Sequence, residues 1–322
     1  MTQATETIAE KIAAGSSVIP LPSIGSWSAS AHRFDDIQLG AIRAAELAGR
    51  PLLVRGEPGL GKSQIARAIA ATQQWHLVTT VVNARTEIED LLYSVDHVSR
   101  LSAANRAQQV EDIEDYIRKG PIWRALSLTE YSDNDRPGDR ADKGWYKPTE
   151  GCVLLIDEID KAQSDVPNAL LEVLNAGKFD VPLLDKVIGA SNPNIFIVVS
   201  ANDDRSLPAA FLRRCATLHL TLGSNPVDDL VSTAKAHMQV DLLGPVTEDI
   251  CRQTAQQLVE YRRDLSTHEY KPGTSEYLDL LRAIGRSMQR DDSLTEEQIS
   301  IPVSYTHLRA HETVLSRMPS SA

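Results

Sequence analysis

One glycine-rich segment constrains this chain more than any other feature. Residues 56–63 read GEPGLGKS, which matches the phosphate-loop pattern G-x-x-x-x-G-K-[ST]. Such glycines let backbone N–H groups turn inward around phosphate oxygens, and the following helix directs its positive end at the same anion. An apolar run at 51–54 precedes the segment, and apolar residues at helical spacing follow it within 65–70. This context predicts a nucleoside-triphosphate site.

The positions of this loop carry specific expectations. Lys62 is expected to reach the β- and γ-phosphates, and the Ser63 hydroxyl to bind Mg²⁺. Together with Asp157, the predicted nucleotide-binding residues are Gly56, Glu57, Pro58, Gly59, Leu60, Gly61, Lys62, Ser63 and Gln64.

Two further strand-like runs end in polar residues. The run 153–156 is followed by Asp157 and Glu158. At a strand end beside the phosphate loop, Asp157 is predicted to hold Mg²⁺, and Glu158 to orient or deprotonate the attacking water. Asn202 follows the run 195–200 and is predicted to bond the γ-phosphate and that water. The alternatives are a strand ending at the surface and a polar turn, which the neighbouring motifs disfavour.

An arginine pair, Arg213 and Arg214, precedes the last strand-like run, 217–222. An arginine supplied across a subunit boundary can neutralise charge developing on the γ-phosphate, which contributes about 10³–10⁵ in rate. The alternative is a solvated basic helix end.

The periodicity predicts an α/β domain followed by a helical one. Strand-like and helical patterns alternate over 34–223, which favours a parallel sheet with helices on both faces. The strand candidates are 52–55, 77–82, 153–156, 195–200 and 217–222. We predict an N-terminal arm or linker at 1–33, a small helical domain at 224–301 and a long exposed loop at 127–150.

The final segment, 302–322, resembles translated sequencing-adapter read-through and does not continue the preceding periodicity. We therefore interpret it as non-native and expect the helical domain to be truncated. His307 and His311 receive no metal assignment, although their i,i+4 spacing would permit one.

Composition narrows the class of partner. A formal net charge of −11 disfavours nucleic acid, which normally requires a basic face. No apolar run approaches the ~18–20 residues that a membrane span needs, and the N-terminus lacks a signal-peptide pattern. Cys152, Cys215 and Cys251 show no metal-ligand spacing and are interpreted as reduced thiols. These features predict a cytoplasmic protein.

The motifs, in this order and spacing, resemble those of the AAA+ ATPases. Segments such as RPLLVRGEPGLGKS, VLLIDEIDKAQSDVPNALLEVL and SANDDRSLPAAFLRRC resemble the MoxR-like branch, and the similarity extends over roughly 51–284. The resemblance implies a P-loop NTPase αβα sandwich with a five-stranded parallel sheet and an all-α lid. It also implies Mg²⁺ and ATP at the subunit boundaries of a homo-oligomeric ring, usually a hexamer. Arg214 is the better match to the arginine finger, with Arg213 second.

For function, the resemblance implies chaperone-like remodelling or maturation of a protein client, often beside a von Willebrand factor A domain partner. One alternative is a nucleic-acid-stimulated motor of the restriction or translocase type, which the acidic charge disfavours. The other is a nucleotide-dependent binding module without turnover. Its signature is a missing Glu158, Asn202 or finger arginine, and none is missing.

The chain departs from the family pattern in two places. Leu60 stands where many relatives carry threonine. Glu276 stands where other branches carry a lid arginine that touches the γ-phosphate, and Lys271 or Arg282 could substitute for it.

Two insertions are also expected from the resemblance. A hairpin within 179–197 is typical of the MoxR-like branch. The segment 87–96 occupies the position of a central-pore loop, where Tyr93 either grips a threaded segment or, as we favour, packs against a helix.

Overall fold

The computed structural model describes residues 6–25, 27–106, 112–127, 151–189, 194–203, 205–265 and 271–289. The loop predicted at 127–150 lies outside these ranges except for its first residue. The tail at 302–322, with His307 and His311, also lies outside them.

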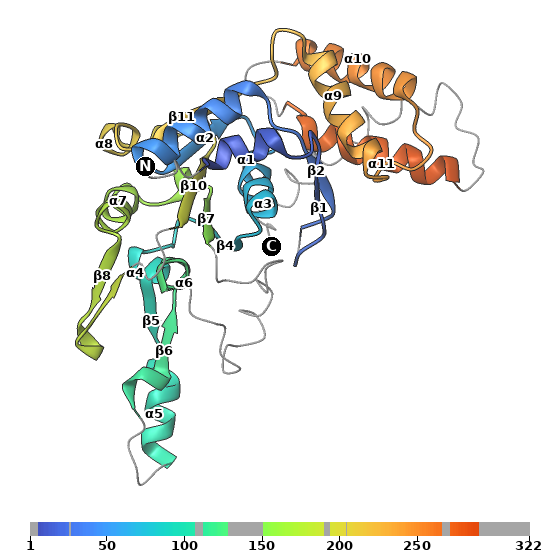
Figure 1. Ribbon diagram of the computed structural model, residues 1–322. Helices are drawn as coiled ribbons and strands as arrows, with labels where there is room; N and C mark the ends of the chain where they lie inside the picture. Colours follow the sequence, from blue (N-terminus) through green and yellow to red (C-terminus); the bar gives the residue numbers. More distant parts are fainter. Residues whose placement is uncertain are drawn as a thin grey trace.

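Five parallel strands form the central sheet in the order β11-β3-β10-β7-β4 (Figure 1). The strands are β3 (Leu52–Gly56), β4 (His76–Val81), β7 (Cys152–Asp157), β10 (Ile195–Ala201) and β11 (Ala216–Leu220). Each predicted strand coincides with one of these to within two residues, and the predicted fold class is confirmed. The order places β10 between the strand that leads into the glycine-rich loop and the strand that ends in the acidic pair.

Both faces of the sheet are covered, which explains the unbroken apolar runs of its central strands. Val153 and Leu155 of β7 belong to one core, and Leu154 and Ile156 belong to the other. The first core includes α1 (Ile8–Ala14), α2 (Asp36–Ala48) and α3 (Lys62–Gln73). The second includes α6 (Pro121–Ser127), α7 (Val166–Ala176) and the short α8 (Ala209–Leu212).

The segment predicted as an arm or linker packs against the sheet domain. Ile8 and Ile12 of α1 are buried in the first core, because their i,i+4 spacing places them on one helix face. The ribbon of β1 (Ile19–Leu21) and β2 (Ser30–His32) contacts α3. The exact domain boundaries stay predictions.

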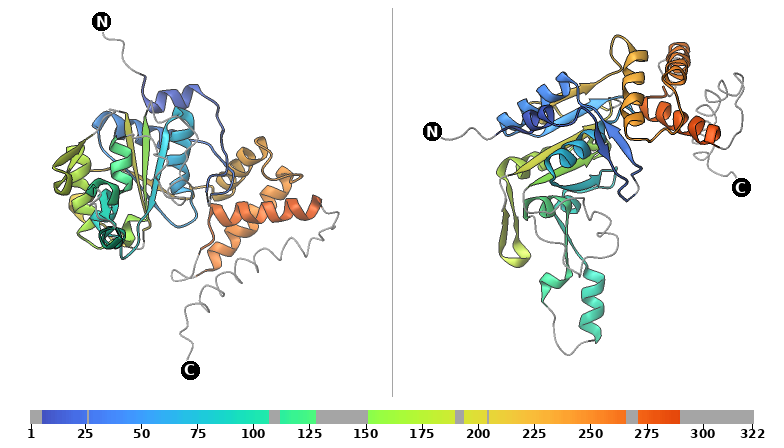
Figure 2. Two further views of the ribbon diagram at one scale, coloured as in Figure 1. Left: turned by 90° about the horizontal axis from the view of Figure 1, so that it is seen from below. Right: turned by 45° about the vertical axis from the view of Figure 1, so that its right-hand side comes forward.

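The C-terminal helices form a separate small core beside the sheet domain (Figure 2). They are α9 (Pro226–Gln239), α10 (Glu248–Asp264) and α11 (Thr274–Gln289). Thr247 caps α10, and its hydroxyl accepts a hydrogen bond from the Ile250 N–H at 3.4 Å. We call these three helices the lid.

Two insertions project from the same side of the sheet domain (Figure 1). The first contains α4 (Ile88–Leu92), β5 (Tyr93–Val95), α5 (His97–Arg106), η1 (Ile113–Tyr116) and β6 (Ile117–Lys119). The second is the predicted hairpin, formed by β8 (Lys178–Val181), η4 (Pro182–Leu184) and β9 (Lys186–Gly189). Lys186 and Glu114 join them through an ion pair of 2.8 Å.

Tyr93 of the first insertion packs against the second insertion and against α6. Its ring stacks on Phe179 with centroids 6.4 Å apart and meets Trp123 edge-on at 6.0 Å. This supports the packing interpretation, although Tyr93 lies in β5 and not in a helix.

All three cysteines are buried and free. Burial raises the pKa of Cys152 to about 12 and that of Cys215 to about 11, so these thiols stay protonated at neutral pH. None of the helices in the described ranges has both the length and the apolar character needed to cross a bilayer.

Candidate active site

The glycine-rich loop joins β3 to α3 and depends on backbone conformations that glycine favours. Gly59 and Gly61 have φ angles of +79° and +82°. At Gly56, with φ +146°, an added Cβ would lie only 2.4 Å from the carbonyl oxygen of Leu220 in β11. Gly61 is the N-cap residue of α3, and it has no side chain that could cap the first turn of this helix. The loop therefore presents backbone groups and a helix N-terminus, which together suit a phosphate anion.

Lys62 lies where three oxygens meet. Its Nζ donates to the carbonyl oxygens of Gly56 and Glu57, both at 2.8 Å, and to Oδ1 of Asn202 at 2.7 Å. The side chain is almost completely buried. The ammonium group is thus fixed at the mouth of the loop and beside the end of β10.

Asp157 is held by two hydroxyl groups. Ser63 Oγ donates to Asp157 Oδ2 at 2.7 Å, and Ser200 Oγ donates to the other carboxylate oxygen. Carboxylate and hydroxyl oxygens are the hard ligands that Mg²⁺ prefers. The groups at this point therefore fit a magnesium ion.

Glu158 takes up an unusual backbone conformation directly after β7. Its φ of 60° and ψ of 41° lie in the left-handed region, which is uncommon for a residue other than glycine. Its N–H donates to Ser200 Oγ at 3.0 Å, and its carboxylate pairs with Lys161 at 2.6 Å. The Glu158 side chain is about one-third exposed, so water can reach it.

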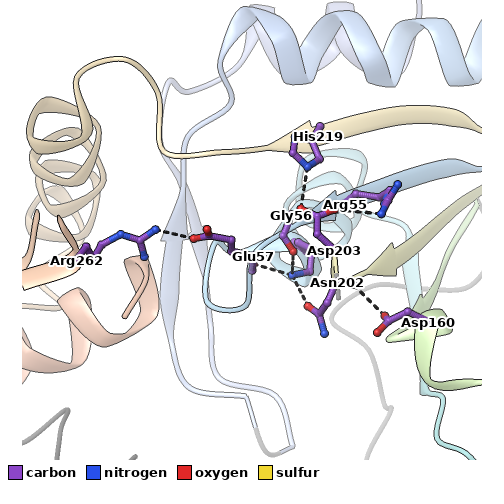
Figure 3. Close-up of polar contacts among 9 residues, drawn as sticks. Arg55, Gly56, Glu57, Asp160, Asn202, Asp203, His219 and Arg262 are labelled. Carbon is purple, nitrogen blue, oxygen red and sulfur yellow. Dashed lines mark hydrogen bonds and ion pairs between the residues drawn. The ribbon is translucent and has the colours of Figure 1, made fainter. Parts of the chain in front are cut away.

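A hydrogen bond at Asn202 and ion pairs at Asp203 hold the loop after β10 in place (Figure 3). The buried Asp160 carboxylate accepts the Asn202 N–H at 2.9 Å. The Asp203 carboxylate contacts Arg55 of β3 at 3.3 Å and His219 of β11 at 2.8 Å. These contacts fix the backbone that presents the Asn202 amide to Lys62.

The lid contacts the glycine-rich loop directly. Arg262 of α10 pairs with the Glu57 carboxylate at 2.6 Å (Figure 3). It also donates to the Pro272 carbonyl at 2.5 Å. The backbone N–H and hydroxyl of Ser275 donate to the Gly59 carbonyl at 3.0 and 3.1 Å. A lid arginine is therefore present at the loop, at a position that sequence analysis did not identify.

The three lid residues considered from the sequence behave differently. Glu276 accepts the Gly273 N–H at 2.7 Å, as part of the turn that begins α11. Arg282 pairs with Asp279 at 3.0 Å and donates to the Ala29 carbonyl at 3.2 Å, so these contacts are with α11 and the ribbon segment. Lys271 makes no hydrogen bond or ion pair with any described residue. None of them supplies a cation to the loop.

A cleft of about 820 Å³ lies between the ribbon, the start of α3, the end of β11 and the lid. Gly59, Leu60, Gly61 and Gln64 line one wall, so the cleft continues from the loop. Its volume lies in the range of small-ligand and cofactor sites.

Arg67 of α3 attaches the ribbon wall of the cleft to the loop helix. It is 1% exposed, donates to Gln64 Oε1 and to the Pro22 carbonyl, both at 2.8 Å, and lies 4.9 Å from the Trp27 ring centroid. Burial lowers the pKa of Arg67 to about 10, so the guanidinium remains charged at neutral pH.

The arginine pair does not lie with the other site residues in the same chain. Arg213 and Arg214 are exposed and precede the first residue of β11. The other end of β11, Leu220, pairs with Gly56 at the start of the loop. The two arginines therefore lie at the opposite end of β11 from the glycine-rich loop.

Among the side chains that contact the predicted site residues, sequence analysis missed Ser200, Asp160 and Arg262, as well as Lys161, Arg67 and Ser275. Ser200 carried a readable signal, because a hydroxyl in an otherwise apolar buried strand needs a partner. Asp160, within the motif DEID, carried a weaker one. No local pattern marks Arg262.

The loop at the end of β3 and the acids at the end of β7, on a sheet of this strand order, define the P-loop NTPase class with an AAA fold. A family profile, the AAA domain of the dynein-related subfamily, matches residues 51–215, about half of the chain. The chain belongs to this family and is an AAA+ ATPase. Nucleotide binding is the general property of this class.

Curated proteins that resemble this chain at 24% sequence identity are chaperones. The chain is 24% identical to chaperone protein ClpB of Enterococcus faecalis (strain ATCC 700802 / V583) over 205 residues, which cover 62% of this chain and 19% of ClpB. It is 24% identical over 206 residues to ClpB of Lactococcus lactis subsp. cremoris (strain MG1363), with the same coverage. The matched region is thus about a fifth of the length of these relatives.

Among solved structures, the chain is similar to a protein from Cytophaga hutchinsonii ATCC 33406. The TM-score is 0.41 and the sequence identity 13%, with 98% of this chain and 94% of that chain covered.

Proposed function

We propose that this chain is a MoxR-like AAA+ ATPase that couples hydrolysis of Mg²⁺-bound ATP to remodelling or maturation of a partner protein. The observation that carries the proposal is the convergence of loop, acids and amide. Lys62 Nζ contacts Asn202 Oδ1 at 2.7 Å, and Ser63 Oγ contacts Asp157 Oδ2 at the same distance. Segments far apart in the sequence thus meet at one point.

Binding of ATP is assigned to the loop. The backbone N–H groups within residues 56–64, where only Pro58 has none, and the Lys62 ammonium would hold the phosphates. Ser63 and Asp157 would hold Mg²⁺, which supplies charge neutralisation on the phosphate oxygens when it is bound. The cleft beside Leu60 and Gln64 would receive the nucleoside.

Hydrolysis is assigned to the acid and the amide. Glu158 accepts a proton from water as the water oxygen bonds to the γ-phosphorus, and the bond from that phosphorus to the bridging oxygen of ADP breaks. Asn202 orients the water and the γ-phosphate. Arg214, with Arg213 as the second candidate, stabilises the developing charge from the neighbouring protomer.

The mechanical part of the proposal concerns the lid and a ring. The lid holds the loop through Arg262 and Ser275, so a change at the phosphates can alter the angle between lid and sheet domain. We propose a homo-oligomeric ring, a hexamer by family resemblance, that acts on a protein client. A von Willebrand factor A domain protein is the proposed partner class. The ClpB relatives are chaperone proteins, which supports remodelling of a protein.

Two substitutions test these roles. Lys62→Ala removes the cation at the phosphates and should abolish ATP binding in a nucleotide titration. Glu158→Gln keeps the side-chain shape but cannot accept a proton. It should bind ATP normally and release phosphate at least about 10²-fold more slowly than the unsubstituted protein. Phosphate release at the normal rate by either variant would refute the role assignment.

A further inference from the structure

Ser200 is a polar residue in the middle of the apolar sheet. It belongs to β10, the central strand, and its exposed fraction is 0%. In the register of the sheet it pairs with Val54 of β3. It also follows Val199, which pairs with Ile156 of β7 immediately before the acidic pair. A hydroxyl buried here would destabilise the fold if it had no hydrogen-bond partner.

The Ser200 hydroxyl contacts both acidic residues at the same time. It donates to one carboxylate oxygen of Asp157 and accepts the backbone N–H of Glu158 at 3.0 Å. The other oxygen of Asp157 accepts from Ser63 at 2.7 Å. The Asp157 carboxylate is therefore fixed from β10 on one side and from the nucleotide loop on the other.

The contact with Glu158 acts on a strained backbone. A left-handed conformation is unfavourable for a residue with a Cβ, and Glu158 adopts it with φ 60°. In this conformation its N–H reaches Ser200, while its carbonyl accepts the Lys161 N–H at 3.0 Å. The hydroxyl thus helps to hold the turn that sets the position of the Glu158 Cα and the direction of its side chain.

We propose that Ser200 is a positioning residue that fixes the Asp157 carboxylate and the Glu158 backbone relative to each other. The inference rests on the proposed function for the roles of the two acids. Ser200 acts through these acids and makes no contact of its own with nucleotide. It thereby fixes the position of the Asp157 carboxylate, proposed to bind magnesium, relative to Glu158, the proposed proton acceptor.

The chemistry requires a hydroxyl at this position. One atom must donate to a carboxylate and accept an N–H, and a serine or threonine oxygen can do both. Alanine would leave the Glu158 N–H and one Asp157 oxygen without this partner. Threonine keeps the oxygen and adds one methyl group.

The test compares Ser200→Ala and Ser200→Thr by two measurements. The first is the Mg²⁺ concentration that half-saturates binding of a fluorescent ATP analogue. The second is steady-state phosphate release, analysed as kcat and KM. Loss of a group that hydrogen-bonds and orients a metal ligand typically lowers metal affinity or activity about 10–100-fold. Ser200→Ala should raise the half-saturating Mg²⁺ concentration about 10-fold and lower kcat by about 10–100-fold, with KM for ATP changed less than about 3-fold. Ser200→Thr should restore most of both values.

Val199→Ala is the matched control, because Val199 is also completely buried in β10 but contributes no hydroxyl. It should lower the melting temperature and leave kcat within about 3-fold of the unsubstituted protein, since it removes packing only. If Ser200→Thr fails to fold, the comparison of Ser200→Ala with Val199→Ala decides.

Two results would overturn the proposal. The first is a folded Ser200→Ala protein with unchanged kcat and Mg²⁺ dependence. The second is a Val199→Ala protein that loses kcat as strongly as Ser200→Ala. If the unsubstituted protein binds Mg²⁺ and nucleotide without turnover, the proposed hydrolysis is wrong, and the Mg²⁺ dependence still decides the role of Ser200. If it binds no nucleotide, both proposals fail.

Discussion

At the residue scale, the site depends on a close approach between two backbones. Gly56 has a positive φ and lies beside the Leu220 carbonyl. An added methyl group would therefore clash with main-chain atoms, which cannot shift without distorting the backbone. We expect Gly56→Ala to lower the free energy of unfolding by about 3 kcal/mol or more. Urea denaturation followed by circular dichroism measures this change.

Gly40 provides a control of opposite sign. It lies in α2, and an added Cβ there would meet no heavy atom within 4 Å. Gly40→Ala should raise the free energy of unfolding by about 0.5–1 kcal/mol, because alanine favours the helix and restricts the unfolded chain. Equal effects of the two substitutions would show that the Leu220 contact does not constrain Gly56.

At the scale of elements, a buried histidine joins the lid to the ribbon. His237 of α9 is 1% exposed, its Nδ1 contacts the Thr233 carbonyl at 2.9 Å, and its Nε2 lies 3.2 Å from the Ala31 N–H. The ring is therefore neutral, with the proton on Nδ1. Burial lowers the pKa of His237 to about 4.

This pKa predicts a stability change with pH. Because the folded state binds the proton more weakly than the unfolded state, the contribution is complete above pH 6.5 and is lost as pH falls toward 4. Between pH 7.5 and 5.0 the loss is about 2 kcal/mol. His237→Gln cannot titrate but can accept the Ala31 N–H, so its unfolding free energy should depend less on pH by this amount. An unchanged pH dependence in urea titrations would contradict the assignment.

The lid contact with the loop makes a second prediction at this scale. Arg262 is 14% exposed and Glu57 46%, and their ion pair connects α10 to the nucleotide loop. A triphosphate in the loop should attract Arg262 and repel Glu57. We expect Arg262→Gln to weaken ATP binding about 5-fold, or about 1 kcal/mol, and Glu57→Gln to strengthen it. Arg263→Gln, at the exposed neighbouring position, is the control and should change nothing in a nucleotide titration.

The sequence predicted elements that depend on local pattern better than contacts that depend on strand order. The five strands were found because buried parallel strands are continuous apolar runs, as in 153–156. Lys62, Ser63 and Asp157 were found because their spacing is fixed by one loop and one strand end. The sequence indicates that the buried Ser200 hydroxyl needs a partner, but it does not identify Asp157 and Glu158 as the partners, since that contact requires β10 to lie beside β7. Arg262 was missed because it reaches Glu57 only through the position of the lid against the sheet domain, which no local sequence pattern indicates.

At the scale of the whole molecule, the central claim is that one site is built from two protomers. Lys62, Asp157 and Asn202 meet within a single chain, whereas Arg214 lies at the opposite end of β11 from the glycine-rich loop. In a ring, the exposed arginine pair of one protomer can face the nucleotide of the next. The acids and the finger would then act on the same phosphate only after assembly.

The most direct test mixes two inactive variants, Lys62→Ala and Arg214→Ala, and measures phosphate release. In a mixed ring, an Arg214→Ala protomer supplies an intact nucleotide loop, and a Lys62→Ala neighbour supplies the arginine. Each variant alone should be inactive, and the mixture should recover a substantial fraction of normal activity. No recovery, with subunit exchange verified by mass measurement of the mixed assembly, would contradict the claim that Arg214 acts across the subunit boundary.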